Sequence, residues 1–224
     1  MANSEEKRIV DLSHVIEHGM TTYPGLPGPH ICDFWTREDS ARNYEDGSSF
    51  QIGRIDMVAN TGTYLDSPFH RYAEGLDLAD LPLPSLADLP GIVVRRPWEN
   101  EIASSASHFE GLDVRGKAVL LHTGWDRHWR TERYGENHPY LTTDAAEWLV
   151  ENGVALVGID SNNIDDTRVQ ARPVHTKLLG ADIPICEHMT GLGQLPDGGF
   201  RFSAVPPKVR GMGTFPVRAY AVLS

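Results

Sequence analysis

The stretch TDAAEWLVENGVALVGID, residues 143–160, predicts a helix followed directly by a strand, and this order decides the fold class. Thr142 or Thr143 can cap the start of a helix over Asp144–Asn152, and Gly153 stands where glycine commonly ends a helix. Apolar residues recur on one face of that helix, at Ala145, Trp148 and Leu149. The aliphatic run 155–160 is typical of a buried strand, so the two elements resemble the second half of a β-α-β unit.

Further aliphatic or β-branched runs extend this pattern along the chain, and they predict strands at Ile9–Leu12, Phe50–Asn60, Gly91–Arg95, Ala118–His122 and Tyr220–Leu223. Apolar residues fall on both faces of the segment 50–60, which predicts a strand inside a sheet or between layers. A short helix is expected over His175–Leu179, and the Pro- and Gly-rich run Gly19–Pro29 predicts a rigid irregular loop. The 224 residues suit one mixed α/β domain, which we expect to span residues 1–224.

The charge balance of the chain limits the classes of partner that it is expected to bind. With 31 acidic and 20 basic residues the formal net charge is -11, which argues against nucleic acid or an anionic membrane surface. No apolar run approaches the ~20 residues of a membrane span, and Met1–Arg8 lacks a signal-peptide core, so a cytoplasmic location is expected. The two cysteines, Cys32 and Cys186, are too few and too far apart to indicate a disulfide framework.

The chemistry is concentrated in NTGTYLDSPFH, residues 60–70. In an extended chain every second residue points to the same side, which would align an amide, a phenol, a carboxylate and an imidazole along one wall, from Asn60, Tyr64, Asp66 and His70. Gly62 removes a side chain where a close approach is needed, and Pro68 fixes the backbone before the histidine. Polar residues on an edge strand would give a similar pattern, so the spacing alone leaves both interpretations open.

This stretch resembles the signature of the cyclase family, the group that includes bacterial kynurenine formamidase, which has the form His-x-Gly-Thr-His-x-Asp-x-Pro-x-His. The sequence matches at Gly62, Thr63, Asp66, Pro68 and His70, and it departs at the two metal-binding histidines, which are Asn60 and Tyr64 here. Other family-like segments follow in the expected order, namely 11–14, 19–25, 120–125, 138–141, 158–161, 175–179, 183–187 and 216–219. The resemblance implies a swivelling β/β/α fold with a mixed sheet, and it implies a homodimer or homotetramer.

The resemblance also implies a ligand set and a reaction. In typical members the two signature histidines, the signature aspartate, a later histidine and a later glutamate hold the metal; the last three map onto Asp66, His175 and Glu187. The final signature histidine, His70 here, is the general base and acid of the family. The implied reaction opens an amide or lactam with water activated by one divalent ion, Zn²⁺ or Mn²⁺.

The two departures weaken the implied metal site. Asn60 offers only a neutral amide oxygen, and Tyr64 could bind a metal only as phenolate, from a reference pKa of ~10. Three functions therefore stay open. The leading one is an arylformamidase-like hydrolase of an amide, lactam or ester bond, in which His70 moves the proton.

The second is a metal-independent cyclase, dehydratase or isomerase, in which Tyr64 and Asn60 stabilise an oxyanion while His70 and Asp66 handle protons. The third is a non-catalytic binder of small molecules. In each case the partner is a small molecule, and Tyr23, Phe34 and Trp35 could line an apolar pocket for an aromatic one.

Overall fold

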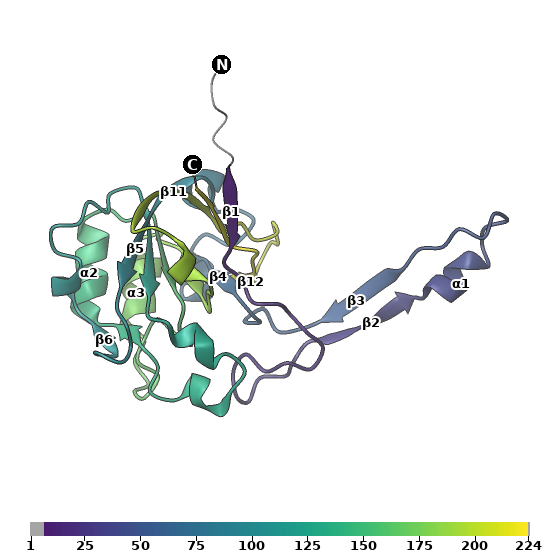
Figure 1. Cartoon of the computed structure of the whole chain (residues 1–224), viewed down its shortest axis with the longest axis horizontal. Helices are drawn as coiled ribbons and strands as arrows, with labels where there is room; N and C mark the ends of the chain where they lie inside the picture. The colour runs from purple at the N-terminus through teal and green to yellow at the C-terminus, as the bar shows by residue number, and fades with distance from the viewer. Residues whose placement is uncertain (1–6, 224) are drawn as a thin grey trace, which may run out of the picture.

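A twisted mixed sheet runs through the body of the protein, and the computed structural model describes residues 7–223 of the chain (Figure 1). The sheet has nine strands in the order β1-β13-β11-β5-β7-β9-β10-β4-β12. Their bounds in that order are Arg8–Asp11, Tyr220–Leu223, Gly198–Ser203, Leu89–Arg95, Ala118–His122, Leu156–Ile159, Ile185–Glu187, Tyr64–Asp66 and Thr214–Pro216. The neighbours within β5-β7-β9-β10 are parallel and all other pairs are antiparallel, so the sheet has a parallel centre with antiparallel flanks.

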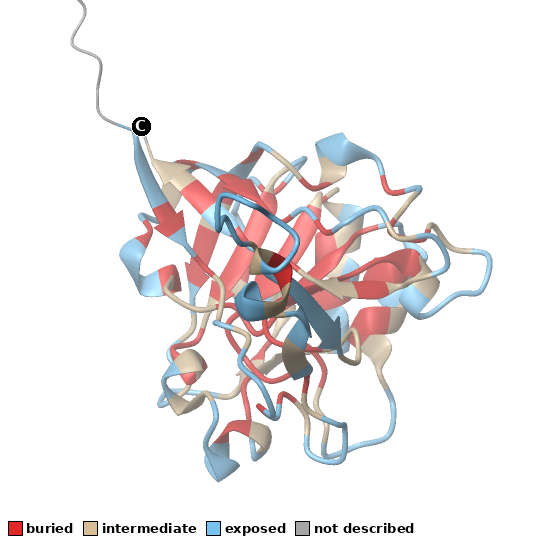
Figure 2. Ribbon diagram, turned by 90° about the vertical axis from the view of Figure 1, so that its right-hand side faces the viewer, coloured by how far each residue is buried: buried red, intermediate tan, exposed pale blue. Residues whose placement is uncertain are grey.

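Two hydrophobic clusters cover the sheet and hold it in place. On one face, helices α2 (Thr143–Glu151) and α3 (Pro173–Gly180) lie side by side and bury aliphatic residues of β5, β7 and β9. The other cluster contains Leu120, Phe200 and Phe202, and the strands of the body are largely buried in Figure 2. Burying both faces of the parallel centre explains why its strands are continuous aliphatic runs rather than alternating ones.

The stretch 143–160 folds as predicted. Thr142 is the N-cap residue of α2, Asn152 ends it, and Gly153 adopts the left-handed φ of 73° expected of a C′ glycine. Strands β7 and β9 on either side of the helix are parallel neighbours, which confirms the predicted β-α-β unit. The second predicted helix is also present, as α3, and begins two residues earlier at Pro173.

The signature stretch is less extended than the sequence suggests. Only Tyr64–Asp66 forms a strand, β4, while Gly62 has a φ of 66° and Pro68–His70 forms the 3-10 turn η1. The expectation that residues 60–70 line one wall in strict alternation is therefore wrong outside β4. The proline starts the turn because its fixed φ suits the first position of a helix, and the turn carries His70 away from the strand direction.

A long hairpin arm projects from the body (Figure 1). It consists of β2 (His30–Trp35), α1 (Arg37–Ala41) and β3 (Ile52–Asp56), and its two strands pair only with each other. The prediction that a strand over Phe50–Asn60 lies inside a sheet or between layers is wrong. Every residue of β3 is exposed, and the apolar residues on both of its faces contact no second layer among the described residues.

Short elements complete the fold. Strands β6 (Ala103–Ser104) and β8 (Tyr140–Leu141) form a small parallel pair. Five further 3-10 turns are η2 (Leu83–Ser85), η3 (Ala106–His108), η4 (Trp125–His128), η5 (Glu132–Gly135) and η6 (Leu192–Gln194). Both cysteines are free thiols, and across residues 7–223 no helix is long and apolar enough to cross a bilayer.

Candidate active site

Three short strands at one edge of the sheet bring the signature residues next to the C-terminal part of the chain. β4 lies between β10 and β12, so that Tyr64 is the direct cross-strand partner of Glu187, and Asp66 is the partner of Thr214. Side chains of directly opposed residues project from the same face of a sheet. The register therefore places a phenol beside one carboxylate and a hydroxyl beside the other, all of them buried.

Asp66 and His70 meet through Thr214. The Thr214 hydroxyl donates to Asp66 Oδ1, and His70 Nδ1 lies 2.9 Å from the same hydroxyl oxygen. His70 Nδ1 is 3.6 Å from Asp66 Oδ1, while the two side chains are 36% and 1% exposed respectively. The imidazole thus lies where solvent or a small molecule can reach it, and the carboxylate lies behind it.

His175 projects from α3 toward both buried carboxylates. Its Nδ1 is 2.7 Å from Asp165 Oδ2, and its Nε2 is 3.6 Å from Asp66 Oδ2 and 3.6 Å from Glu187 Oε1. Burial lowers the pKa of His175, but the carboxylates of Glu187, Asp165 and Asp66 outweigh it and raise that pKa to about 10. Without a bound metal ion the ring is therefore an imidazolium at neutral pH, and its Nε2 has to lose a proton before it can ligate one.

Glu187 is held by two tyrosines rather than left free. Tyr64 Oη donates to Glu187 Oε2 at 2.6 Å, Tyr23 Oη lies 3.0 Å from Tyr64 Oη, and the Ile164 amide donates to Glu187 Oε1 at 2.6 Å. Burial raises the pKa of Glu187 to about 7, against the lowering effect of His175. Burial and the nearby Glu187 also raise the pKa of the Tyr64 phenol well above its ordinary value, so Tyr64 is a neutral donor and not a phenolate ligand.

The structure brings together five of the six residues predicted for the site, namely Tyr64, Asp66, His70, His175 and Glu187. The sixth, Asn60, lies half-buried in the loop before β4. Within residues 7–223 no side-chain hydrogen bond joins it to the other five. Its predicted role toward a substrate stays a prediction.

The geometry of the cluster fits a divalent cation. Asp66, His70 and His175 each offer a ligand atom, and these atoms lie within 4.8 Å of one another. Asp66 Oδ2 is buried without a hydrogen-bond partner among the described residues, and its 3.6 Å separation from His175 Nε2 is close to the roughly 3.4 Å between donors of a tetrahedral ion. Asp165 on the far nitrogen of His175 orients the ring as carboxylates do behind metal-binding histidines.

The sequence did not predict two residues of the site, Thr214 and Asp165, and it did not predict the contacts that Tyr23 makes there. Thr214 belongs to no motif and reaches the site only because β12 pairs with β4. Asp165 is fully buried and contacts His175, which lies ten residues later in the chain. The one sequence signal that could have identified it is its position shortly after the family-like segment 158–161. Tyr23, which could line an apolar pocket for an aromatic ligand, donates to the Asn162 carbonyl at 2.6 Å and lies 3.0 Å from the Tyr64 hydroxyl, two contacts that the sequence does not predict.

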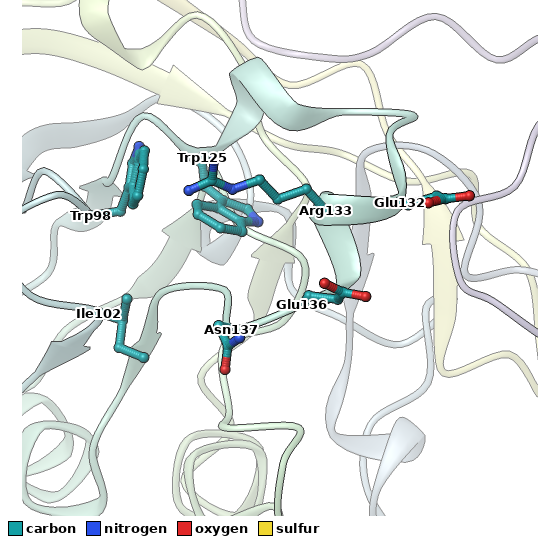
Figure 3. A pocket seen from close by; sticks show the side chains of 7 residues that line it. All are labelled: Trp98, Ile102, Trp125, Glu132, Arg133, Glu136 and Asn137. Atoms are coloured by element: carbon teal, nitrogen blue, oxygen red, sulfur yellow. The ribbon is translucent and has the colours of Figure 1, made fainter.

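A well-defined cavity of the described structure lies away from this cluster. It has a volume of about 520 Å³ and lies beside η4 and η5, where Trp98, Trp125 and Arg133 form its wall (Figure 3). The Arg133 guanidinium carbon lies 4.6 Å from the ring centre of Trp98. An arginine against two neighbouring indoles is an ordinary surface arrangement, so the cavity alone assigns no chemistry.

Comparison with known proteins identifies the family. The sequence model of the family described as Cyclase matches residues 10–166, well over half of the chain and all of the signature stretch. The chain belongs to the cyclase family. The resemblance carried by residues 60–70 is thereby confirmed, although two of the signature histidines are replaced in this member.

Curated relatives and solved structures agree with this assignment. The kynurenine formamidase of Erythrobacter litoralis (strain HTCC2594) is 27% identical over 205 residues, covering 91% of this chain and 88% of the relative. That of Bacillus cereus (strain ATCC 14579) is 27% identical over 214 residues, covering 94% and 95%. An isatin hydrolase bound to the product analogue thioisatinate superposes with a TM-score of 0.82 at 21% identity, covering 98% of this chain and 94% of that one. A structure described as a potential metal-dependent hydrolase with cyclase activity gives 0.79 at 24% identity, covering 98% and 99%. These superpositions confirm the predicted cyclase-like α/β fold.

Proposed function

We propose that this cyclase-family member is a hydrolase of C–N bonds in small molecules, opening an amide or a lactam, with an ester as a further substrate class. One observation carries the proposal: Asp66 Oδ2, which has no hydrogen-bond partner among the described residues, faces His175 Nε2, with the accessible imidazole of His70 beside them. The relatives named kynurenine formamidase and isatin hydrolase act on small aromatic substrates with such bonds, which supports an aromatic amide or lactam here.

In this proposal His70 is the proton carrier. Its ring is partly exposed while Asp66 behind it is buried, so a substrate and a water molecule can approach the ring only from the open side. The ring takes a proton from the attacking water and returns it to the departing nitrogen, the two tasks that one residue performs in general acid–base catalysis. A nearby carboxylate stabilises the imidazolium that forms between these steps.

The proposed metal ligands are Asp66, His175 and Glu187, with Zn²⁺ or Mn²⁺ as the ion. The group of ligand atoms within 4.8 Å of one another contains His70 in place of Glu187, whose oxygens accept from Tyr64 and the Ile164 amide. A bound ion of this kind lowers the pKa of water toward ~7 and so supplies hydroxide at neutral pH. Two carboxylates and one imidazole form a weaker set than one that also contains two signature histidines. Tyr64 contributes indirectly, because its hydroxyl holds Glu187 in place at 2.6 Å.

A second function is favoured by the same tyrosine contact. Tyr64 Oη already satisfies Glu187 Oε2 without an ion, and Tyr23 Oη lies 3.0 Å from this phenol while it donates its own hydrogen to the Asn162 carbonyl. A site of this kind suits proton transfer in a metal-independent cyclase, dehydratase or isomerase, with Asn60 as an oxyanion donor and with Tyr64 joining it only if its hydrogen leaves Glu187. Turnover that persists in the presence of a strong chelator would favour this function over metal-assisted hydrolysis.

We also propose that the protein forms a homodimer or homotetramer through the hairpin arm. An isolated two-stranded ribbon is marginally stable in water, and this one exposes Phe34 by 70% and Ile55 by 55%. A second copy is the partner always present where the chain folds, and closed homo-oligomers are the commonest assemblies. Light scattering of the Phe34→Asp variant tests this, with a smaller assembly expected than in the wild type. The single domain over residues 1–224 and the cytoplasmic location stay predictions.

The function is tested with two model substrates, an N-formyl arylamine and the cyclic lactam isatin. We expect the wild type to release formate or open the ring, and His70→Asn to lose about 100-fold or more in kcat. His108→Gln is the matched control, since His108 caps the distant turn η3, and its turnover should equal the wild type. If the wild type hydrolyses neither substrate, or if His70→Asn retains full turnover, the proposed function fails.

A further inference from the structure

Thr214 occupies a special position in the cluster because it touches both Asp66 and His70. It lies directly across the strand pair from Asp66, is 3% exposed, and has its hydroxyl 2.9 Å from His70 Nδ1. A hydroxyl has one hydrogen to donate and lone pairs that accept. An ionised carboxylate only accepts, so the single hydrogen of Thr214 goes to Asp66 Oδ1.

This hydrogen-bond arrangement determines which ring nitrogen of neutral His70 carries the proton. With its hydrogen committed to Asp66, Thr214 can only accept from the imidazole, so the neutral ring carries its proton on Nδ1. The lone pair is then on Nε2, which is the nitrogen free to take a proton from water. The other tautomer would place the lone pair of Nδ1 against the lone pairs of the threonine oxygen.

The backbone shows that this contact is built into the fold. A Cβ on Gly213 would lie 2.4 Å from the backbone nitrogen of His70 and 2.5 Å from its Cα, so any side chain at position 213 would separate β12 from η1. The Gly213 carbonyl accepts the Ser67 amide at 2.7 Å, which clamps the segment against the start of the turn. The glycine thus permits the close approach that puts the Thr214 hydroxyl within hydrogen-bond distance of His70.

We infer that Thr214 is a positioning residue that holds His70 in the Nδ1-protonated tautomer, with Gly213 as the glycine that brings it there. The catalytic consequence rests on the proposed function, in which His70 carries the proton. The alternative role for Thr214 is to satisfy the buried Asp66 and nothing more. The two roles differ in what happens to the His70 ring when the hydroxyl is removed.

The tautomer itself is the first measurement, and it does not depend on catalysis. In ¹⁵N-labelled, diamagnetic protein, at a pH where the ring is neutral, His70 is assigned by the signals lost in His70→Asn. We expect its ¹⁵N shifts to report Nδ1–H in the wild type and in Thr214→Ser, and a shift toward Nε2–H in Thr214→Val. An unchanged tautomer in Thr214→Val would overturn the inference.

Kinetics on the model substrates give the second measurement. Thr214→Val has nearly the shape of threonine, and we expect kcat to fall about 10- to 100-fold with KM little changed, as when the partner of a functional side chain is removed. Thr214→Ser keeps the hydroxyl and should restore most of kcat, while Thr142→Val at the start of α2 is the matched control with full turnover. Equal losses in the Val and Ser variants, or none in either, would overturn the inference. A wild type without hydrolase activity would instead refute the proposed function and leave the tautomer test intact.

Discussion

Asp66, in β4, and Asp160, just after β9, are both buried at 0% exposure, but their carboxylates differ in how many hydrogen bonds they accept. Asp160, just after β9, accepts hydrogen bonds from the Thr123 amide at 2.7 Å, the Thr123 hydroxyl at 2.6 Å and the Gly124 amide at 2.8 Å. Asp66 has one partner on Oδ1, Thr214, and none among the described residues on Oδ2. Saturated hydrogen bonding is typical of a structural carboxylate, whereas a buried oxygen without a hydrogen-bond partner leaves room for a further contact, such as a water molecule or an ion.

The free-energy cost of burying an unpartnered polar atom supports this distinction between Asp66 and Asp160. A buried polar atom without a partner costs about 1–3 kcal/mol, and a buried charge costs more. The Asp66 oxygen faces His175 Nε2 at 3.6 Å, too far for a hydrogen bond but suited to an ion between them. We therefore expect substitution of Asp66 to abolish function and substitution of Asp160 to reduce stability.

The largest expected effect is that of Asp66→Asn. It removes the open oxygen and the charge behind His70, and we expect kcat on the model substrates to fall about 1,000-fold, or roughly 4 kcal/mol in barrier height. Single-turnover kinetics would measure this loss. The distinction between the two carboxylates would be contradicted if Asp66→Asn kept wild-type turnover, or if Asp160→Asn lost as much kcat as Asp66→Asn.

The sequence predicts the centre of the fold well because its contacts are local. Residues 142–160 contain the N-cap position, the apolar stripe, the terminating glycine and the following strand, and the structure has each of them, although the Thr142 side chain makes no capping hydrogen bond. The segment 50–60 fails for a related reason. Its apolar residues satisfy a strand pattern, but the pattern does not say whether another layer of the same chain covers them, and none does in the described structure.

The candidate site is predictable only as far as its motif extends. Asp66, His70, His175 and Glu187 follow from the family pattern, but the sequence does not indicate that Thr214 lies opposite Asp66. That contact depends on the pairing of β4 with β12 across 148 positions of sequence. The pairing of β4 with β10 places the Tyr64 hydroxyl on Glu187, a contact that the alternation of residues 60–70 does not predict.

The Asp160→Asn variant tests whether Asp160 serves stability rather than activity. The amide keeps one accepting oxygen but turns an NH₂ group toward a backbone amide that needs an acceptor, so we expect a loss of about 1–3 kcal/mol in the free energy of unfolding. Urea denaturation would measure it. The folded fraction should keep its turnover, and a stable but inactive Asp160→Asn would show that the two carboxylates share one role.

A smaller effect is the pH dependence of stability that Asp160 contributes. Burial raises the pKa of Asp160 from 3.8 to about 7, against the lowering effect of its Thr123 hydrogen bonds. The folded state therefore binds this proton more tightly than the unfolded state, so this contribution to stability is full below about pH 4 and is lost as pH rises toward 7. Relative to Asp160→Asn, the wild type should lose up to about 1.4 kcal/mol per pH unit in that window. Parallel curves for the two proteins would contradict this assignment.

The central claim is that the open oxygen of Asp66 marks a divalent-ion site shared with His175. Calorimetric titration of chelator-treated protein with Zn²⁺ tests it most directly, with elemental analysis of the protein as purified beside it. We predict one ion per chain in the wild type and in Asp160→Asn, and at least tenfold weaker binding in Asp66→Asn. Equal affinity in Asp66→Asn and the wild type, or no stoichiometric binding to the wild type, would contradict the account.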